Sequence, residues 1–146
     1  MWSAQLIIQA DIPAPPDTLF AYISDLTRHG EWAANQLTIT PIIPGPVVQG
    51  SIYNSHAQVK NLEFHSKLQV TTYDPPRHFA FTGEDKTGRF EHHFTLHPHQ
   101  KGTELTRRIN FDLTFSQWLF FKLTYYPVRL PAAREAMNRL TQHFQS

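Results

Sequence analysis

The chain has 146 residues and no cysteine, which predicts one domain over 1–146 and excludes disulfides, thiolate metal sites and cysteine nucleophiles. Thirteen Lys and Arg against twelve Asp and Glu leave a net charge of +1, too small to indicate nucleic-acid binding. No run of about 18 apolar residues exists, so we expect no transmembrane segment. No signal peptide is visible at the N-terminus, and we therefore expect a cytoplasmic protein.

The N-terminal segment predicts a strand followed by two short helical segments. Residues 4–12 alternate apolar and polar side chains, which is the period of a half-buried strand. Pro16 suits the first position of a helix that ends near Ser24. A second turn of helix is predicted over 26–32.

Alternation with a period of two continues through the middle of the chain. Short turns rich in Pro, Gly and Asp separate the alternating segments, and turns of this length join antiparallel strands. Six further strands are predicted, over residues 37–43, 51–58, 62–73, 79–81, 89–97 and 103–113.

The C-terminal segment changes to helical spacing. A helix is predicted over Ser116–Tyr126, with Ser116 as a candidate N-cap, and a second helix opens at Pro131. Pro127 and Pro131 each remove a helix hydrogen bond, so the two parts must be kinked or split. The apolar stripe of the second part consists of Ala133, Ala136, Met137, Leu140 and Phe144. This order predicts an α+β domain whose curved sheet is covered by the terminal helix.

Turn and core motifs are distributed over nearly the whole chain. They are Ile12-Pro-Ala-Pro-Pro-Asp-Thr-Leu-Phe20, Ile23-Ser-Asp25, Trp32, Gly50-Ser-Ile-Tyr53, Tyr73-Asp-Pro-Pro-Arg-His-Phe-Ala-Phe81 and Gly102-Thr-Glu-Leu105. Together with the order of elements, they resemble the START-like (SRPBCC) superfamily, especially its polyketide cyclase/dehydrase branch. The resemblance implies a helix-grip fold. In that fold a seven-stranded antiparallel curved sheet wraps a long C-terminal helix, kinked here by the prolines, with two short helices after the first strand and a cavity between sheet and helix.

Strand parity predicts which side chains face such a cavity, independently of the resemblance. Most of these side chains are apolar, but His92 and Arg107 interrupt the pattern. The inner sets are Leu62, Phe64, Ser66, Leu68 and Val70; Phe79 and Phe81; Phe90, His92, Phe94 and Leu96; and Leu105, Arg107, Ile109, Phe111 and Leu113.

His92 and Arg107 are the candidate catalytic residues. Burial of an unpaired charge is costly, so each needs a partner or water. In the functional hypothesis, His92 acts as an acid/base or a hydrogen-bond donor, and Arg107 binds an anionic or enolate oxygen. The alternative is that both are satisfied structural residues with no chemistry.

Two other segments leave alternatives open. In strand 51–58 either Ile52, Asn54 and His56 or Tyr53, Ser55 and Ala57 could form the inner set, and the resemblance alone favours Tyr53. The segment Trp118–Leu130 is apolar nearly all round. It could be ordinary core, a ligand portal, a dimer contact or a contact with a membrane surface. The full set of expected ligand-binding residues is Trp32, Tyr53, Phe64, Ser66, Phe79, Phe81, His92, Phe94, Arg107, Phe111, Trp118, Phe121 and Tyr125.

The histidines do not predict a metal site by their spacing along the chain. His92 and His93 are adjacent on a strand, so their side chains point to opposite faces. His97 and His99 flank a proline in a hairpin, and no nearby carboxylate completes a ligand set. No nucleophile elbow, phosphate loop or dinucleotide fingerprint is present, so we expect neither a metal nor a cofactor.

Three functions are consistent with these observations. The first is binding of a hydrophobic small molecule, aromatic or lipid-like, which the inward aromatic residues support. The second is an enzyme of the cyclase/dehydrase type that uses His92 and Arg107. The third is a protein-interaction module resembling the co-chaperone members of the superfamily, with a homodimer as a further alternative.

Overall fold

The computed structural model describes residues 2–86, 88–120, 122–123 and 126–145. One strand, two short helical segments, six strands and two C-terminal helices follow one another in the predicted order. The elements are β1 (Trp2–Ile12), α1 (Pro16–Ile23), the 3₁₀ segment η1 (Leu26–Glu31), β2 (Gln36–Pro41), β3 (Ile52–Val59), β4 (Leu62–Asp74), β5 (His78–Asp85), β6 (Gly88–His99), β7 (Gly102–Leu113), α2 (Phe115–Phe120) and α3 (Tyr126–Phe144).

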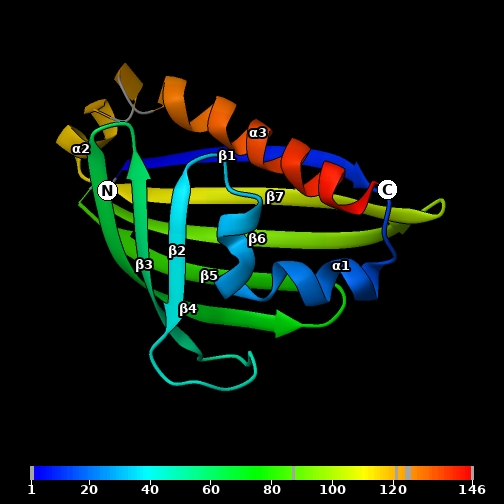
Figure 1. Cartoon of the computed structure of the whole chain (residues 1–146). Helices are drawn as coiled ribbons and strands as arrows, with labels where there is room; N and C mark the ends of the chain where they lie inside the picture. Colours follow the sequence, from blue (N-terminus) through cyan, green and yellow to red (C-terminus); the bar gives the residue numbers. More distant parts are fainter. Residues whose placement is uncertain (1, 87, 121, 124–125, 146) are drawn as a thin grey trace.

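All seven strands form one antiparallel sheet in the order β1-β7-β6-β5-β4-β3-β2. Figure 1 shows the sheet curving around one side of the molecule, with α3 lying along β1 and with α1 after the end of β1. A register shift between Val70 and Thr72 marks a bulge in β4, and a bulge of this kind bends a long strand. The helix-grip fold and its α+β class are thereby confirmed.

The core lies between the concave face of the sheet and the helices. Phe79 and Phe94 are fully buried and stack on each other, and Phe79 also packs edge-on against Phe20 of α1. From α3, the core receives four members of the predicted stripe: Ala133, Ala136, Met137 and Leu140. The inward prediction for Leu62 was wrong, because this first residue of β4 directly follows the turn and is 45% exposed.

The start of α2 differs from the expected one. The helix begins at Phe115, and Thr114 rather than Ser116 caps it. The backbone N–H of Gln117 donates to Oγ1 of Thr114 at 3.3 Å, and the N–H of Thr114 donates to Oε1 of Gln117 at 2.9 Å. This reciprocal pair is a capping box, and it satisfies two backbone donors at once.

The position of the helix break also differs from the expected one. The helix α3 begins at Tyr126 and continues through Pro131, so neither proline marks its start or end. The interruption lies before Pro127, where residues 122–123 have π-helical geometry. A proline in the first turn costs no hydrogen bond, which explains why the helix can start ahead of Pro127. Within the described residues, none of the helices has both the length and the apolarity needed to cross a bilayer.

Candidate functional site

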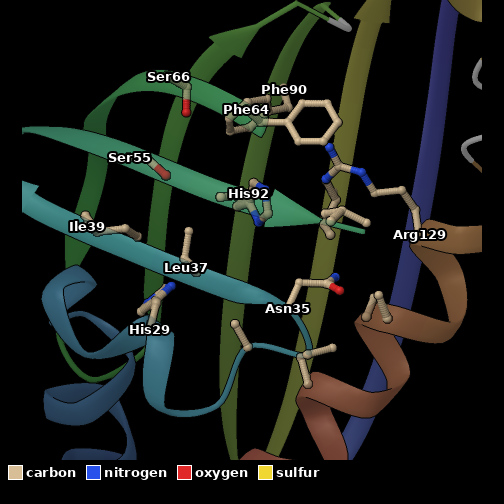
Figure 2. Close-up of a pocket in the computed structure, with 18 of the residues that line it drawn as sticks. His29, Asn35, Leu37, Ile39, Ser55, Phe64, Ser66, Phe90, His92 and Arg129 are labelled. Carbon is tan, nitrogen blue, oxygen red and sulfur yellow. The ribbon is translucent and has the colours of Figure 1, made fainter. Parts of the chain in front are cut away.

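A cavity of about 190 Å³ lies between the sheet and α3. All seven strands contribute to its apolar wall, and α3 contributes small residues, so space remains between helix and sheet. The apolar lining includes Leu6, Leu37, Ile39, Ala57, Phe64, Leu68, Phe81, Phe90 and Ile109, together with Ala132, Ala133 and Ala136. Figure 2 shows Phe64 and Phe90 at one end and His29 at the other, with His92 between them.

Six of the predicted ligand-binding residues line this cavity: Trp32, Phe64, Ser66, Phe81, His92 and Arg107. In β3, the residues that face the cavity are Ser55, Ala57 and Val59, so the odd-numbered residues form the inner set. Tyr53 belongs to that set and is buried, but it lies along the strand beyond the cavity wall.

Five other predicted residues do not line the cavity: Tyr53, Phe79, Phe94, Phe111 and Trp118. Phe79 and Phe94 share the correct parity, but Phe20 and Trp32 pack against them and fill that end of the fold. Trp118 stacks beside Phe115 of α2 instead. The odd or even position of a residue along its strand decides which face of the sheet its side chain is on. The elements packed on that face decide whether space remains there. Phe121 and Tyr125 lie outside the described residues.

His92 and Arg107, on neighbouring strands β6 and β7, contact each other in the cavity wall. The NH2 group of Arg107 donates to Nδ1 of His92 at 3.4 Å. The guanidinium also lies over the rings of Trp32 and Phe94, at 5.4 and 5.5 Å from their centroids. Phe81 stacks on the imidazole of His92 at 4.7 Å.

The same burial has opposite consequences for the charges of these two groups. Burial, reinforced by the positive charge of Arg107, moves the pKa of His92 well below its usual range. The imidazole is therefore neutral at pH 7, and its Nδ1 accepts a hydrogen bond, so its proton is on Nε2. Burial and then repulsion by Arg129 lower the pKa of Arg107 to about 10, which leaves the guanidinium charged. Part of the Arg107 side chain lines the cavity, so the residue is only half-buried.

Two buried donors in this part of the wall have no hydrogen-bond partner among the residues that the structure describes. They are Nε1 of Trp32 and Nε of Arg107. A buried donor without an acceptor costs about 1–3 kcal/mol, so such groups are uncommon in folded proteins. Both donors belong to residues of the cavity wall, which makes a bound acceptor the simplest way to satisfy them.

Sequence reasoning missed His29, which lies in η1 and lines the cavity. Its Nε2–H donates to the carbonyl oxygen of Ile23 at 2.6 Å. Desolvation lowers its pKa to about 4, so it is neutral at pH 7. The sequence did contain a signal, because Leu26, His29 and Trp32 recur at intervals of three residues and a 3₁₀ helix has three residues per turn. All three side chains are buried in the structure.

Sequence reasoning also missed Arg129 and Asp85. Arg129 lies four residues before Ala133, so extending the predicted stripe by one turn reaches it. Its NH2 group lies 3.9 Å from Oδ2 of Asp85, whose side chain is only 5% exposed. Figure 2 shows Arg129 extending from α3 toward Phe90. The cavity thus has an ion pair at this end and a second guanidinium, Arg107, beside His92.

Comparison with known families identifies the family of this chain. The family described as polyketide cyclase / dehydrase and lipid transport matches residues 4–144. The chain belongs to this family. A relative, Toxin Rv0910 of Mycobacterium tuberculosis, is 28% identical over 85 residues, which are 58% of this chain. The matched segment spans 59% of the length of that relative.

Solved structures share the fold over almost the whole length of this family member. TTHA0849 from Thermus thermophilus has a TM-score of 0.78 at 15% identity, covering 97% of both chains. Ginseng major latex-like protein 151 from Panax ginseng has a TM-score of 0.70 at 12% identity, covering 99% of both chains. At these identities the likeness shows the fold alone.

Proposed function

We propose that this protein binds a compact aromatic molecule that carries an anionic or strongly accepting oxygen. The rings of the ligand would contact Phe64, Phe81 and Phe90, and its oxygen would bind Arg107. The observation that carries this proposal is the charge of Arg107 in a mostly apolar cavity. Within the described residues, Arg107 contacts one neutral imidazole and two aromatic faces, and no carboxylate.

The buried positive charge of Arg107 favours an anionic ligand over a cation or a neutral hydrocarbon. A buried charge is stable only when it is paired or well hydrogen-bonded. Cation–π contacts with Trp32 and Phe94 supply part of this stabilisation. The free donors of Arg107 and Trp32 supply the rest when an oxygen of the ligand accepts from them.

The volume of the cavity limits the size of the ligand. A cavity of about 150 Å³ lined by apolar side chains accommodates benzene. The present volume of about 190 Å³ therefore suits one or two rings. A long acyl chain or a four-ring polyketide exceeds this volume.

Binding of 2-naphthoate tests this proposal, with the neutral 2-naphthamide as a matched probe. We expect 2-naphthoate to bind about tenfold or more tightly than the amide, since hydrogen bonds to charged groups contribute about 1.5–3 kcal/mol. The variant Arg107→Met should remove this preference while binding of the amide persists. Isothermal titration calorimetry measures both affinities, and quenching of Trp32 fluorescence gives an independent signal.

The matched control is Arg108→Met, because Arg108 is the next residue of β7 and its exposed side chain lies on the opposite face. This control should keep the preference for the acid. Equal affinities for acid and amide in the wild type, or the same loss in both variants, would contradict the proposal.

A cyclase/dehydrase activity is the second candidate, and the contact between His92 and Arg107 supports it. An acid/base residue works best when its pKa lies near the operating pH. The pKa of His92 lies well below that range, which makes it a weak base at pH 7. The arrangement therefore favours binding over proton transfer, although Arg107 could still stabilise an enolate.

The protein-interaction alternative and the homodimer remain predictions. Their support is an exposed apolar row formed by Phe115, Leu119 and Leu123, which follow one another at intervals of four residues.

A further inference from the structure

Three side chains able to bind a metal ion gather on the outer face of the β3–β4 hairpin, away from the cavity. His56 lies on β3, and Glu63 and His65 lie on β4. His56 is directly opposite His65 in the register, and Glu63 lies two residues before His65. Alternate residues of a strand point to the same face, so all three side chains project together. The intervening residues, Phe64 among them, face the cavity instead.

The geometry brings the ligand atoms together before any ion is bound. Oε1 of Glu63 lies 3.9 Å from Nε2 of His56, and Oε2 lies 3.9 Å from Nε2 of His65. The two imidazoles stack in parallel, with 4.4 Å between centroids and 4° between planes. One ligand atom from each of the three residues lies within 4.8 Å of the other two.

The turn between the strands fixes this juxtaposition. Val59 is paired with Leu62, so Lys60 and Asn61 alone form the turn, and Lys60 has a positive φ of 55°. The length of a hairpin loop determines the register of the strands beside it, and a slip of one residue would move a side chain to the other face. A register held this tightly keeps His56 opposite His65.

We propose that His56, Glu63 and His65 bind a divalent transition-metal ion, and that Zn²⁺ is the ion they suit best. Two imidazoles and one carboxylate are a common zinc ligand set, with a fourth position left for water. Bonds of about 2.0–2.1 Å to one tetrahedral ion place donors about 3.3 Å apart. Each donor must therefore move by about an ångström, and the two stacked imidazoles must also turn out of their parallel arrangement so that their in-plane lone pairs meet at one ion. Side chains exposed by 46%, 60% and 69% are free to make both adjustments.

The second histidine pair on the outer face is less suited to a cation. Nε2 of His78 lies 3.1 Å from Nδ1 of His93, but Arg108 places a positive charge next to this pair. Glu91 contacts the other nitrogen of His93, so its carboxylate is not directed between the two rings. At the proposed site, the carboxylate of Glu63 lies within 3.9 Å of both imidazoles, and Lys67 follows His65 two residues further along β4.

Calorimetric titration of the full chain with ZnCl₂ tests the proposal. The protein is prepared without a polyhistidine tag and is treated with a chelator beforehand. We expect one equivalent of Zn²⁺ to bind. His56→Gln and His65→Gln should each weaken binding by more than about tenfold, since even residues that only support metal ligands cost about that much. Glu63→Gln should weaken it as well.

The matched control removes two exposed histidines elsewhere, in the double variant His97→Gln/His99→Gln. This variant should bind Zn²⁺ as the wild type does. Thermal unfolding gives a second readout, because Zn²⁺ should raise the Tm of the wild type and of the control but not that of His65→Gln. Absence of saturable binding in the wild type, or unchanged affinity in His65→Gln, would overturn the proposal.

Discussion

Burial in the cavity wall acts differently on the two histidines and on Arg107. His29 and His92 lose their positive charge because desolvation lowers their pKa values below neutrality. Arg107 keeps its charge because even a lowered pKa of about 10 leaves it protonated. Apart from the ion pair of Arg129 and Asp85, the cavity wall therefore presents one guanidinium beside neutral imidazoles, and the proposed preference for an anionic ligand rests on this contrast.

The neutral state of His29 makes the stability of the protein depend on pH. The pKa of His29 is about 4 in the folded state, against an ordinary value of 6.5 in the unfolded chain. Between these two values the unfolded chain binds more protons, so stability decreases as the pH falls below about 6.5. At one pKa unit per 1.36 kcal/mol, this group alone should cost about 2 kcal/mol at pH 5.

Urea unfolding at pH 7.5 and pH 5 measures this loss. The variant His29→Gln can still donate to the carbonyl oxygen of Ile23, but it cannot be protonated, so its stability should fall less on acidification. His97→Gln, a substitution in an exposed hairpin, should retain the pH dependence of the wild type. An unchanged pH dependence in His29→Gln would show that His29 is not the group responsible.

At the scale of the element, local capping determines where α2 begins. Ser116 and Thr114 are both good N-cap residues by type. Thr114 takes this role because Oε1 of Gln117, three residues later, accepts a hydrogen bond from the backbone N–H of Thr114. A residue at position 117 that could not accept this bond would leave the choice between the two open.

This assignment predicts different effects for two similar substitutions. Thr114→Ala should destabilise the protein by about 1 kcal/mol, the usual cost of losing an N-cap. Ser116→Ala should change the free energy of unfolding by less than about 0.5 kcal/mol, as surface substitutions usually do. Chemical denaturation of the two variants distinguishes them, and equal losses would mean that Thr114 is not the dominant cap.

At the scale of the whole molecule, the two faces of β3 and β4 carry different kinds of side chain. Ser55 and Ser66, paired across the strands, face the cavity, while His56 and His65 beside them face outward. Small side chains on the inner face leave the space that a ligand needs. An empty apolar space costs stability, so a binding cavity is retained at the expense of packing.

Filling the cavity should therefore separate stability from binding. Ser66→Leu places an apolar side chain in the cavity, and we expect a Tm no lower than that of the wild type. The affinity for 2-naphthoate should fall by more than about tenfold, because the displaced volume is comparable to a ring of the ligand. Lys67→Leu introduces the same residue on the outer face of β4 and should leave the affinity unchanged.

Much of the fold and part of the site could be predicted from local patterns. The alternation in β4, β6 and β7 correctly placed Phe64, His92 and Arg107 on the inner face, because parity depends only on backbone geometry. The cavity itself could not be located in this way. Phe94 lies two residues after His92 on β6 and faces the same side of the sheet, but it packs against Trp32 and is part of the core.

The sequence by itself determined the order of the elements, the antiparallel sheet and the inward positions of His92 and Arg107, since each follows from local periodicity, turns and composition. Only the tertiary structure decided where the sheet and α3 leave space, that His29 and Arg129 reach it, and that His56 meets His65 on the outer face. The space and the residues that reach it depend on packing between elements far apart in the chain, which no local pattern specifies. The meeting of His56 and His65 depends on the register of the β3–β4 hairpin, which the alternation of side chains does not reveal.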